Sequence, residues 1–169
     1  HTPTLGGSEY LASIHHTVAG MPPIVNFDLE RQVQATCREG IAQGWIKSAH
    51  DCAEGGLAVA LAESCIAGQK GAEVQLEIPQ NTTEGSAFRW DSLLFAEGGA
   101  RILVTVAPEN VEAWESYLQN HLGENWQSLG QVSQSGGSLR ISTPDNLSLI
   151  DVRIEALHDR WFNAIDRRL

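Results

Sequence analysis

The chain has 169 residues, of which 42% are hydrophobic and 19% charged, as expected for one soluble globular domain that can bury a core. Eleven Lys and Arg residues against 21 Asp and Glu residues give a formal charge of −10, which argues against nucleic acid or an anionic membrane as a partner. Three widely spaced cysteines exclude a disulfide framework or a four-ligand zinc site. No apolar run approaches the ~20 residues of a membrane span, so a cytoplasmic location is expected.

The beginning of the chain predicts an arm followed by a helix. Residues 1–26 are expected to form an N-terminal arm or linker, because they are rich in glycine and proline and hold at most one helical turn. Residues 27–169 are expected to form the domain proper. Its first helix is predicted to have Asp28 as its N-cap and to end at Gly44, because apolar residues recur every four positions between them.

Residues 46–68 are the most informative stretch. A short apolar segment leads into His50 and Asp51, then a Gly55-Gly56 pair and an Ala/Leu-rich block, which predicts a strand, a tight turn and a helix beginning at the glycines. Paired glycines let the backbone approach a ligand closely, and the first N–H groups of a helix favour an anion such as phosphate. The same unit also occurs without a ligand. His50 and Asp51 therefore have two open interpretations, a binding role or a structural role in the turn.

The cysteines and the histidine pair offer no metal site. Cys37 and Cys65 fall in predicted helices and are expected to be small core residues. Cys52 lies in the glycine turn near a helix N-terminus, where the pKa of a thiol tends to fall. His15 and His16 have no third ligand at metal-binding spacing, so we expect them on the surface.

The middle of the chain predicts strands around a surface loop. Residues 73–78 alternate polar and apolar side chains and should form a half-buried strand that stops at Pro79. A surface loop is expected at 80–85. Residues 90–95 are ambiguous between a short helix and a lead-in loop. Residues 102–106 are nearly all apolar and predict a central strand.

The last third predicts two helices around short strands. Pro108 should open a helix that Gly123 closes, and residues 125–150 should hold two or three strands with a hairpin turn at 135–137. Asp151 is the expected N-cap of the last helix. The side chains expected to face inward from that helix are those of Ile154, Leu157, Trp161 and Ile165. The scattered tryptophans are expected in the core. The fold class is therefore α+β (α/β layers), with one main mixed sheet packed with helices.

Three segments carry a resemblance to a known family. The string His-Asp-x-x-x-Gly-Gly-Leu-x-x-Ala-Leu-x-Glu at residues 50–63 resembles the signature of the C-terminal domain of the aminoimidazole ribonucleotide synthetase superfamily. Residues 5–11, Leu-Gly-Gly-Ser-Glu-Tyr-Leu, and residues 92–104, with their Leu-Phe-x-Glu motif, resemble the synthetase subunits of phosphoribosylformylglycinamidine synthase. The resemblance covers residues 5 to about 168. It implies that this chain is a fragment of a longer protein.

The resemblance also implies where chemistry takes place. In this superfamily ATP, the magnesium ions and the catalytic histidine belong mainly to an N-terminal domain, so no catalytic or metal-binding residue and no cofactor is expected in this fragment. The C-terminal domain closes the cleft and helps to hold the substrate. The candidates for a substrate or phosphate cleft are His50, Asp51, Gly55, Gly56, Glu97, Gly98, Gly99 and Arg101.

One departure from the family pattern affects this cleft. After the corresponding glutamate, the family's catalytic copy of the domain reads Ser-Gln-Glu-Arg and contacts the substrate, whereas residues 98–101 here read Gly-Gly-Ala-Arg. The hydroxyl and amide donors are missing. The resemblance therefore implies a second, scaffolding copy of the domain in a subunit that contains two ATP-binding halves.

The implied whole enzyme uses ATP, Mg²⁺ and glutamine-derived ammonia to convert formylglycinamide ribonucleotide to the amidine in purine synthesis. Its implied partners are the N-terminal ATP-binding domains of the same chain, a glutaminase subunit and a small bridging subunit, with self-association possible. This fragment alone is expected to be inactive. The alternatives are a non-catalytic assembly module, or the C-terminal domain of another superfamily enzyme such as aminoimidazole ribonucleotide synthetase or selenophosphate synthetase.

Overall fold

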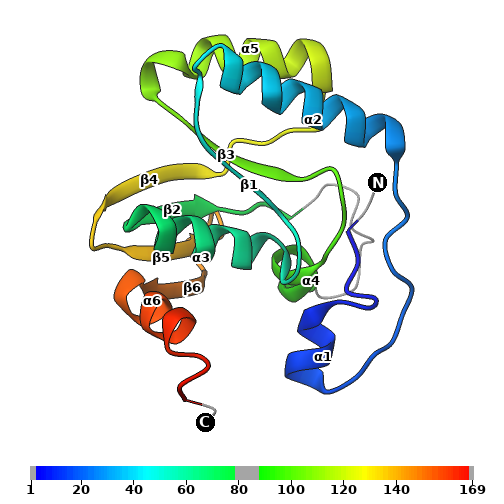
Figure 1. Ribbon diagram of the computed structural model, residues 1–169, viewed down its shortest axis with the longest axis vertical. Coiled ribbons are helices and arrows are strands. Elements are labelled where there is room, and N and C mark those ends of the chain that lie inside the picture. Colours follow the sequence, from blue (N-terminus) through cyan, green and yellow to red (C-terminus); the bar gives the residue numbers. More distant parts are fainter. Residues whose placement is uncertain (1–2, 79–87, 168–169) are drawn as a thin grey trace. The chain divides into compact units, whose positions relative to one another are not determined.

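Two β-sheets organise the part of the chain that this computed structural model describes, residues 3–78 and 88–167 (Figure 1). Contacts divide the chain into two units, which we describe one at a time. The first comprises His1–Ala60 and Asp91–Ser128, and the second comprises Leu61–Trp90 and Leu129–Leu169. The mixture of helices and sheets confirms the predicted α+β class. The described strands pair in two separate groups, a four-stranded mixed sheet and a two-stranded sheet that the sequence did not predict.

The first unit contains most of the helices. In chain order it holds α1 (Glu9–His15), α2 (Phe27–Ala42), β1 (Ile46–Asp51), the start of α3 (Gly56–Gly68), most of α4 (Trp90–Phe95), β3 (Ile102–Val106), the 3₁₀ helix η1 (Pro108–Asn110) and α5 (Val111–Leu122). The ambiguous segment 90–95 is thus helical. The predicted helix from Pro108 to Gly123 is confirmed, with a 3₁₀ turn at its start.

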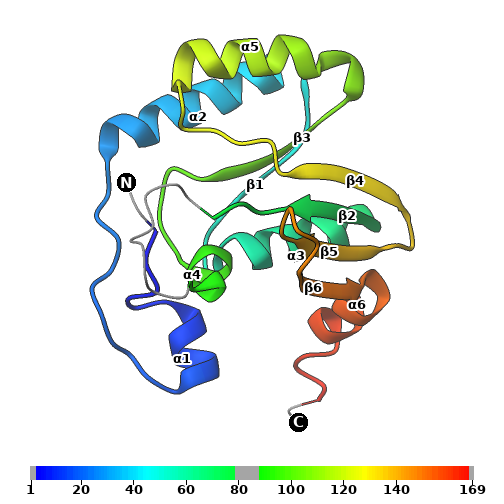
Figure 2. The same ribbon diagram turned by 180° about the vertical axis from the view of Figure 1, so that it is seen from behind.

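A small helix-on-strand core holds the first unit together. β1 and β3 pair antiparallel, with Ile46 opposite Val106. α5 runs alongside α2 in both views (Figures 1 and 2). The buried cluster consists of Val33, Trp114, Leu118 and Leu122, and strand residues pack against it. All of β3 is only half-buried, and among the described residues it pairs with β1 alone, so the prediction of a central strand is wrong.

Side-chain caps set the helix starts in this unit. Asn26, rather than the predicted Asp28, is the N-cap of α2, and its Oδ1 accepts hydrogen bonds from the N–H groups of Asp28 and Leu29, both at 3.1 Å. Either residue type can serve as an N-cap, so composition alone did not separate them. Ser8 is the N-cap of α1 and accepts from the N–H of Leu11 at 3.3 Å. The arm therefore contains a full helix, longer than the single turn predicted.

The second unit is built on a four-stranded mixed sheet. It holds the rest of α3, β2 (Lys70–Gln75), β4 (Gly130–Ser135), β5 (Ser138–Ser142), β6 (Ser148–Arg153) and α6 (Ile154–Phe162). The strand order is β4-β2-β5-β6, in which β2 runs antiparallel to β4 and parallel to β5. Since β2 lies between β4 and β5, the connection at 135–137 joins strands that are not neighbours. The predicted hairpin is therefore wrong.

The buried strand residues of this unit lie on its two inner strands, β2 and β5, and burial alternates along β5. Val74, Leu139 and Ile141 are buried, as is Ile154 at the start of α6. β2 begins three residues before the predicted strand, directly after α3 and Gln69. β2 ends at Gln75, so the prediction that the strand continues to residue 78 is wrong. Pro79 and the predicted surface loop at 80–85 lie outside the described residues.

The last helix differs from its prediction. Asp151 lies within β6, and Arg153 is the N-cap of α6 without a side-chain hydrogen bond, so the predicted cap is wrong. Trp161 and Ile165 are 55% and 73% exposed, which also overturns their predicted inward orientation. Among the residues that the structure describes, no helix is long and apolar enough to cross a membrane.

Candidate ligand cavity beside the glycine turn

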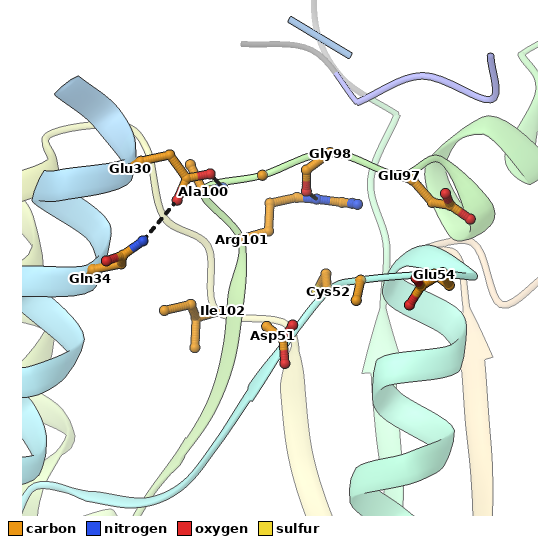
Figure 3. Close-up of a pocket in the computed structure, with 12 residues that line it drawn as sticks. Glu30, Gln34, Asp51, Cys52, Glu54, Glu97, Gly98, Ala100, Arg101 and Ile102 are labelled. Atoms are coloured by element: carbon orange, nitrogen blue, oxygen red, sulfur yellow. Dashed lines mark hydrogen bonds between the residues drawn. The ribbon is translucent and has the colours of Figure 1, made fainter. Parts of the chain in front are cut away.

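A cavity of about 530 Å³ lies in the first unit next to the glycine turn (Figure 3). Its walls come from α2, from the end of β1 with the turn that follows, and from the loop that leads into β3. The lining residues are Glu30, Gln34, Asp51, Cys52, Ala53, Glu54, Glu97, Gly98, Gly99, Ala100, Arg101 and Ile102. The structure thus brings together five of the predicted site residues, which are Asp51, Glu97, Gly98, Gly99 and Arg101.

Glu97 joins three parts of the first unit. Its Oε1 accepts hydrogen bonds from the N–H of Glu9 at 2.8 Å and from the N–H of Gly55 at 2.9 Å. Its backbone exchanges two hydrogen bonds of 3.0 Å with Thr4. Glu9 begins α1 and Gly55 directly precedes α3, so one carboxylate meets the N-terminal ends of two helices, where negative charge is favourable. This side chain therefore ties the arm to the glycine turn.

The glycine pair makes its close approach to the protein's own backbone. Gly55 and Gly56 have φ angles of +78° and +66°, which favour glycine, and α3 begins at Gly56 as predicted. A Cβ atom on Gly56 would lie 2.6 Å from the carbonyl oxygen of Ala96 and 2.9 Å from the carbonyl carbon of Phe95. The N–H of Gly56 donates to the carbonyl of Ala53 at 3.1 Å. Internal packing thus already requires glycine at position 56, and a phosphate role for the pair stays a prediction.

Arg101 organises the loop that forms one wall of the cavity. Its Nη2 donates to the carbonyl of Ala96 at 2.6 Å, and its Nε makes a long contact of 3.5 Å with the carbonyl of Gly98. Figure 3 shows the side chain running along this loop. Burial lowers the pKa of Arg101 from its ordinary value, while Cys52 and Glu97 oppose that shift. The guanidinium stays charged, because arginine does not deprotonate in proteins.

Glu30 closes the other side of the same loop. Its Oε1 accepts a hydrogen bond from the N–H of Ala100, and its Oε2 accepts from Nε2 of Gln34 at 3.3 Å (Figure 3). Ala100 has a φ of +54°, and a Cβ on Gly99 would collide with the Glu30 carboxylate. Glu30 and Gln34 were not among the predicted site residues. Helical periodicity placed them on α2 but gave no indication that this helix lies against a loop 70 residues away.

The charge of the lining is predominantly negative. Glu30, Asp51, Glu54 and Glu97 supply four carboxylates against the single guanidinium of Arg101. A phosphate group entering this cavity would therefore meet like charge on most sides. Among the described residues, no group of three or more His, Cys, Asp or Glu side chains is arranged to hold a metal ion.

His50 does not line the cavity, although its neighbour does. Its Nδ1 lies 2.7 Å from the backbone oxygen of Asp51 and 3.9 Å from the Asp51 carboxylate, whose side chain is 80% exposed. The pair therefore lies at the edge of the site. Whether these two residues bind substrate stays a prediction.

Cys52 is buried in the cavity wall and behaves unlike the prediction. Its N–H donates to the carbonyl of Arg101 at 3.0 Å. Burial raises the pKa of the Cys52 thiol above its ordinary value, Arg101 opposes this shift and Asp51 reinforces it. The expectation of a lowered pKa is wrong, because desolvation of the thiolate is the largest effect. Cys65 is buried as predicted, whereas Cys37 is only half-buried.

The fold and site define an α+β domain in which a glycine turn and a carboxylate-rich cavity lie side by side. The family model for the C-terminal domain of AIR synthase related proteins matches residues 1–142. The chain therefore belongs to this family.

Curated relatives of this chain match it along almost its whole length. The phosphoribosylformylglycinamidine synthase subunit PurL of Trichormus variabilis is 61% identical over 98% of this chain. That alignment covers 21% of the relative, its C-terminal fifth, so this chain spans about a fifth of the length of the curated relatives that it matches.

Solved structures share the fold at low sequence identity. T. maritima PurL complexed with FGAR is 18% identical, with a TM-score of 0.69 over 84% of this chain and 23% of that one. The same protein complexed with ATP gives a TM-score of 0.66 at 18% identity, over 94% and 24% of the two chains. PurLQS from Thermotoga maritima gives 0.68 at 17% identity, over 92% and 25%. At these identities the likeness shows the fold alone.

Proposed function

We propose that this chain is the C-terminal domain of a PurL-type synthetase subunit of phosphoribosylformylglycinamidine synthase, and that it acts there as a scaffold. The observation that carries the proposal is the 61% identity to PurL across 98% of the chain. The parent enzyme would convert formylglycinamide ribonucleotide to the amidine with ATP and glutamine-derived ammonia. ATP would phosphorylate the amide oxygen, and ammonia would then displace the phosphate.

The internal bonding of the cavity supports the scaffolding role. The groups that would be expected to hold an anion already have protein partners, since the N–H of Gly55 donates to Glu97 and the guanidinium of Arg101 donates to its own loop. Four carboxylates in the lining disfavour a phosphate further. The main role of the candidate cleft residues would then be to hold neighbouring parts of the enzyme in place, and not to bind the substrate.

The ATP and Mg²⁺ of the reaction would be held by the N-terminal ATP-binding domains of the parent chain. The complex of T. maritima PurL with ATP is consistent with nucleotide binding somewhere in such a subunit. A glutaminase subunit and a small bridging subunit would be the other partners, and the PurLQS structure shows that a PurL protein forms complexes. We further propose that the enzyme is cytoplasmic.

Turnover by purified parent protein tests this function. We expect ATP- and ammonia-dependent amidine formation from the full-length subunit, and none from this chain alone or from a parent lacking residues 3–167. A full-length Glu97→Gln variant should retain turnover, because an amide oxygen can still accept the two backbone hydrogen bonds. Turnover by the chain alone, or a full-length protein without this activity, would overturn the proposal.

Ligand titration separates a scaffold from a binding domain. Isothermal titration of the chain with Mg-ATP, Mg-ADP and formylglycinamide ribonucleotide should show no saturable binding. Saturable binding that Gly56→Val abolishes without unfolding the protein would instead mean that this copy keeps a working ligand site.

A further inference from the structure

The N-terminal arm has an unusual composition from α1 to the start of α2. Residues 10–27 contain no Asp, Glu, Lys or Arg, although 19% of the chain is charged. Charged side chains flank the stretch directly, with Glu9 before it and Asp28 after it. A solvent-exposed segment of this length, in a protein of charge −10, would be expected to contain charged residues. A segment buried against another surface would be expected to lack them, because burying an unpaired charge is costly.

The same arm exposes its large apolar side chains. Six of them have exposed fractions between 49% and 86%, and they are Ile14, Val18, Met21, Ile24, Val25 and Phe27. Single exposed apolar residues are normal in soluble proteins, but a concentration of them in one segment marks an interaction surface. This arm belongs entirely to the first unit.

The arm is anchored at its base. The ring of Tyr10 stacks on that of Phe95 with a centroid separation of 4.7 Å and an interplanar angle of 2°. The N–H of Gly7 donates to the carbonyl of Ala19 at 2.9 Å, and a Cβ on Gly6 would collide with the backbone of Met21. These contacts fix the arm as far as Met21 before any partner binds, which lowers the entropic cost of docking.

We propose that the arm, residues 14–27, docks against the part of the same parent polypeptide that precedes this chain. In the curated relatives, about four-fifths of the protein lies outside the matched region, which is the C-terminal fifth. The preceding polypeptide would arrive close to the arm, because Thr4 is fixed to Glu97 and Gly6 lies against Met21. Because the preceding polypeptide is covalently joined to the arm, its effective concentration near the arm is high. It should therefore bind the arm in preference to a second copy of the protein or a separate subunit.

The proposal rests on the proposed function only in assuming a PurL-type parent protein. Its test measures contact and not turnover, so either proposal can fail without the other. The occupant should be an apolar, largely uncharged face, because a charged face would be desolvated against the arm without any opposite charge to pair with.

Photo-crosslinking of the full-length parent protein identifies the occupant. p-Benzoylphenylalanine replaces Val18 in one variant and Ile24 in another, and a third carries it at Leu147 as a control that is 54% exposed in the second unit. After irradiation of the dilute subunit alone, we expect monomer-sized products from both arm variants, with the crosslinked peptide from residues that precede this chain. Dimer-sized products, products that need an added subunit, or no product from either arm variant would overturn the proposal.

Cysteine labelling gives a second measurement that introduces no bulk. Val18→Cys and Ile24→Cys in the full-length subunit are alkylated, and the labelled peptides are quantified by mass spectrometry against the same protein in denaturant. We expect labelling of the native arm to be at least tenfold slower than in denaturant at every protein concentration. Equal rates, or protection that appears only as the concentration rises, would overturn the proposal.

Discussion

Replacing Gly56 with alanine tests whether the glycine turn serves internal packing. Gly44 is a matched control within the first unit, because its φ of +73° is close to the +66° of Gly56. The two positions differ in their surroundings. A Cβ on Gly44 would meet nothing within 4 Å, whereas a Cβ on Gly56 would lie within 3.0 Å of three backbone atoms of residues 94–96.

The expected magnitudes follow from this difference. Both alanines must adopt a left-handed conformation, which costs about 1–2 kcal/mol. Only the alanine at position 56 also collides with backbone atoms that cannot rotate away, and overpacking of this kind costs about 1–3 kcal/mol more. Gly56→Ala should therefore lower the free energy of unfolding by about 2–5 kcal/mol, against about 1–2 kcal/mol for Gly44→Ala. The loss is a large part of the 5–15 kcal/mol that is typical of a domain.

Urea unfolding measures the comparison. Circular dichroism should show a lower midpoint for Gly56→Ala than for Gly44→Ala at an unchanged slope, since a changed slope would mean a different amount of exposed surface. Equal losses for the two variants would refute the packing argument. Unchanged stability of Gly56→Ala with lost nucleotide or substrate binding in the full-length subunit would show that the glycine faces a ligand instead.

Three further predictions concern the cavity wall. Glu97→Ala should lower the free energy of unfolding by about 2–3 kcal/mol, because two backbone N–H groups lose a charged acceptor. Glu97→Gln should lower the same free energy, measured by thermal unfolding, by less than half as much. Equal losses for the two variants would contradict this role of the carboxylate. Gly99→Ala should be clearly less destabilising in a Glu30→Ala background, because the added methyl collides with that carboxylate, and additive losses in the double-mutant cycle would contradict the contact. Burial raises the folded-state pKa of Cys52, so the contribution of the neutral thiol to folding stability is complete at low pH and is lost as the pH rises above the ordinary thiol pKa of 9.0. Cys52→Ala should therefore weaken the loss of stability at alkaline pH. An unchanged dependence of stability on pH would contradict this prediction.

Local patterns predicted the elements whose cause is local. The start of α3 follows from the Gly55-Gly56 pair, and the stripe on α5 follows from the spacing of Trp114, Leu118 and Leu122, all three of which are buried. Helix starts and apolar stripes depend on residues within one or two turns of each other. The sequence therefore contains enough information to place them.

Pairing between distant segments was not predictable in the same way. The sequence placed strands in 125–150 correctly, but the position of β2 between β4 and β5 makes the expected hairpin impossible. Asp151 has the right chemistry for a cap and still lies inside β6, because pairing with β5 extends that strand to Arg153. Such outcomes depend on which strand is nearest in space.

The sequence by itself determined the family, the α+β class and most of the helices, because short-range spacing and motif identity carry that information. It also named five residues that line the cavity. Only the tertiary structure decided that Glu30 reaches the same loop, that the Glu97 carboxylate is held by two helix starts, and that this chain leaves the apolar side chains of the arm exposed. Each of these depends on contacts, or on missing contacts, between segments far apart in the chain, which no local pattern encodes.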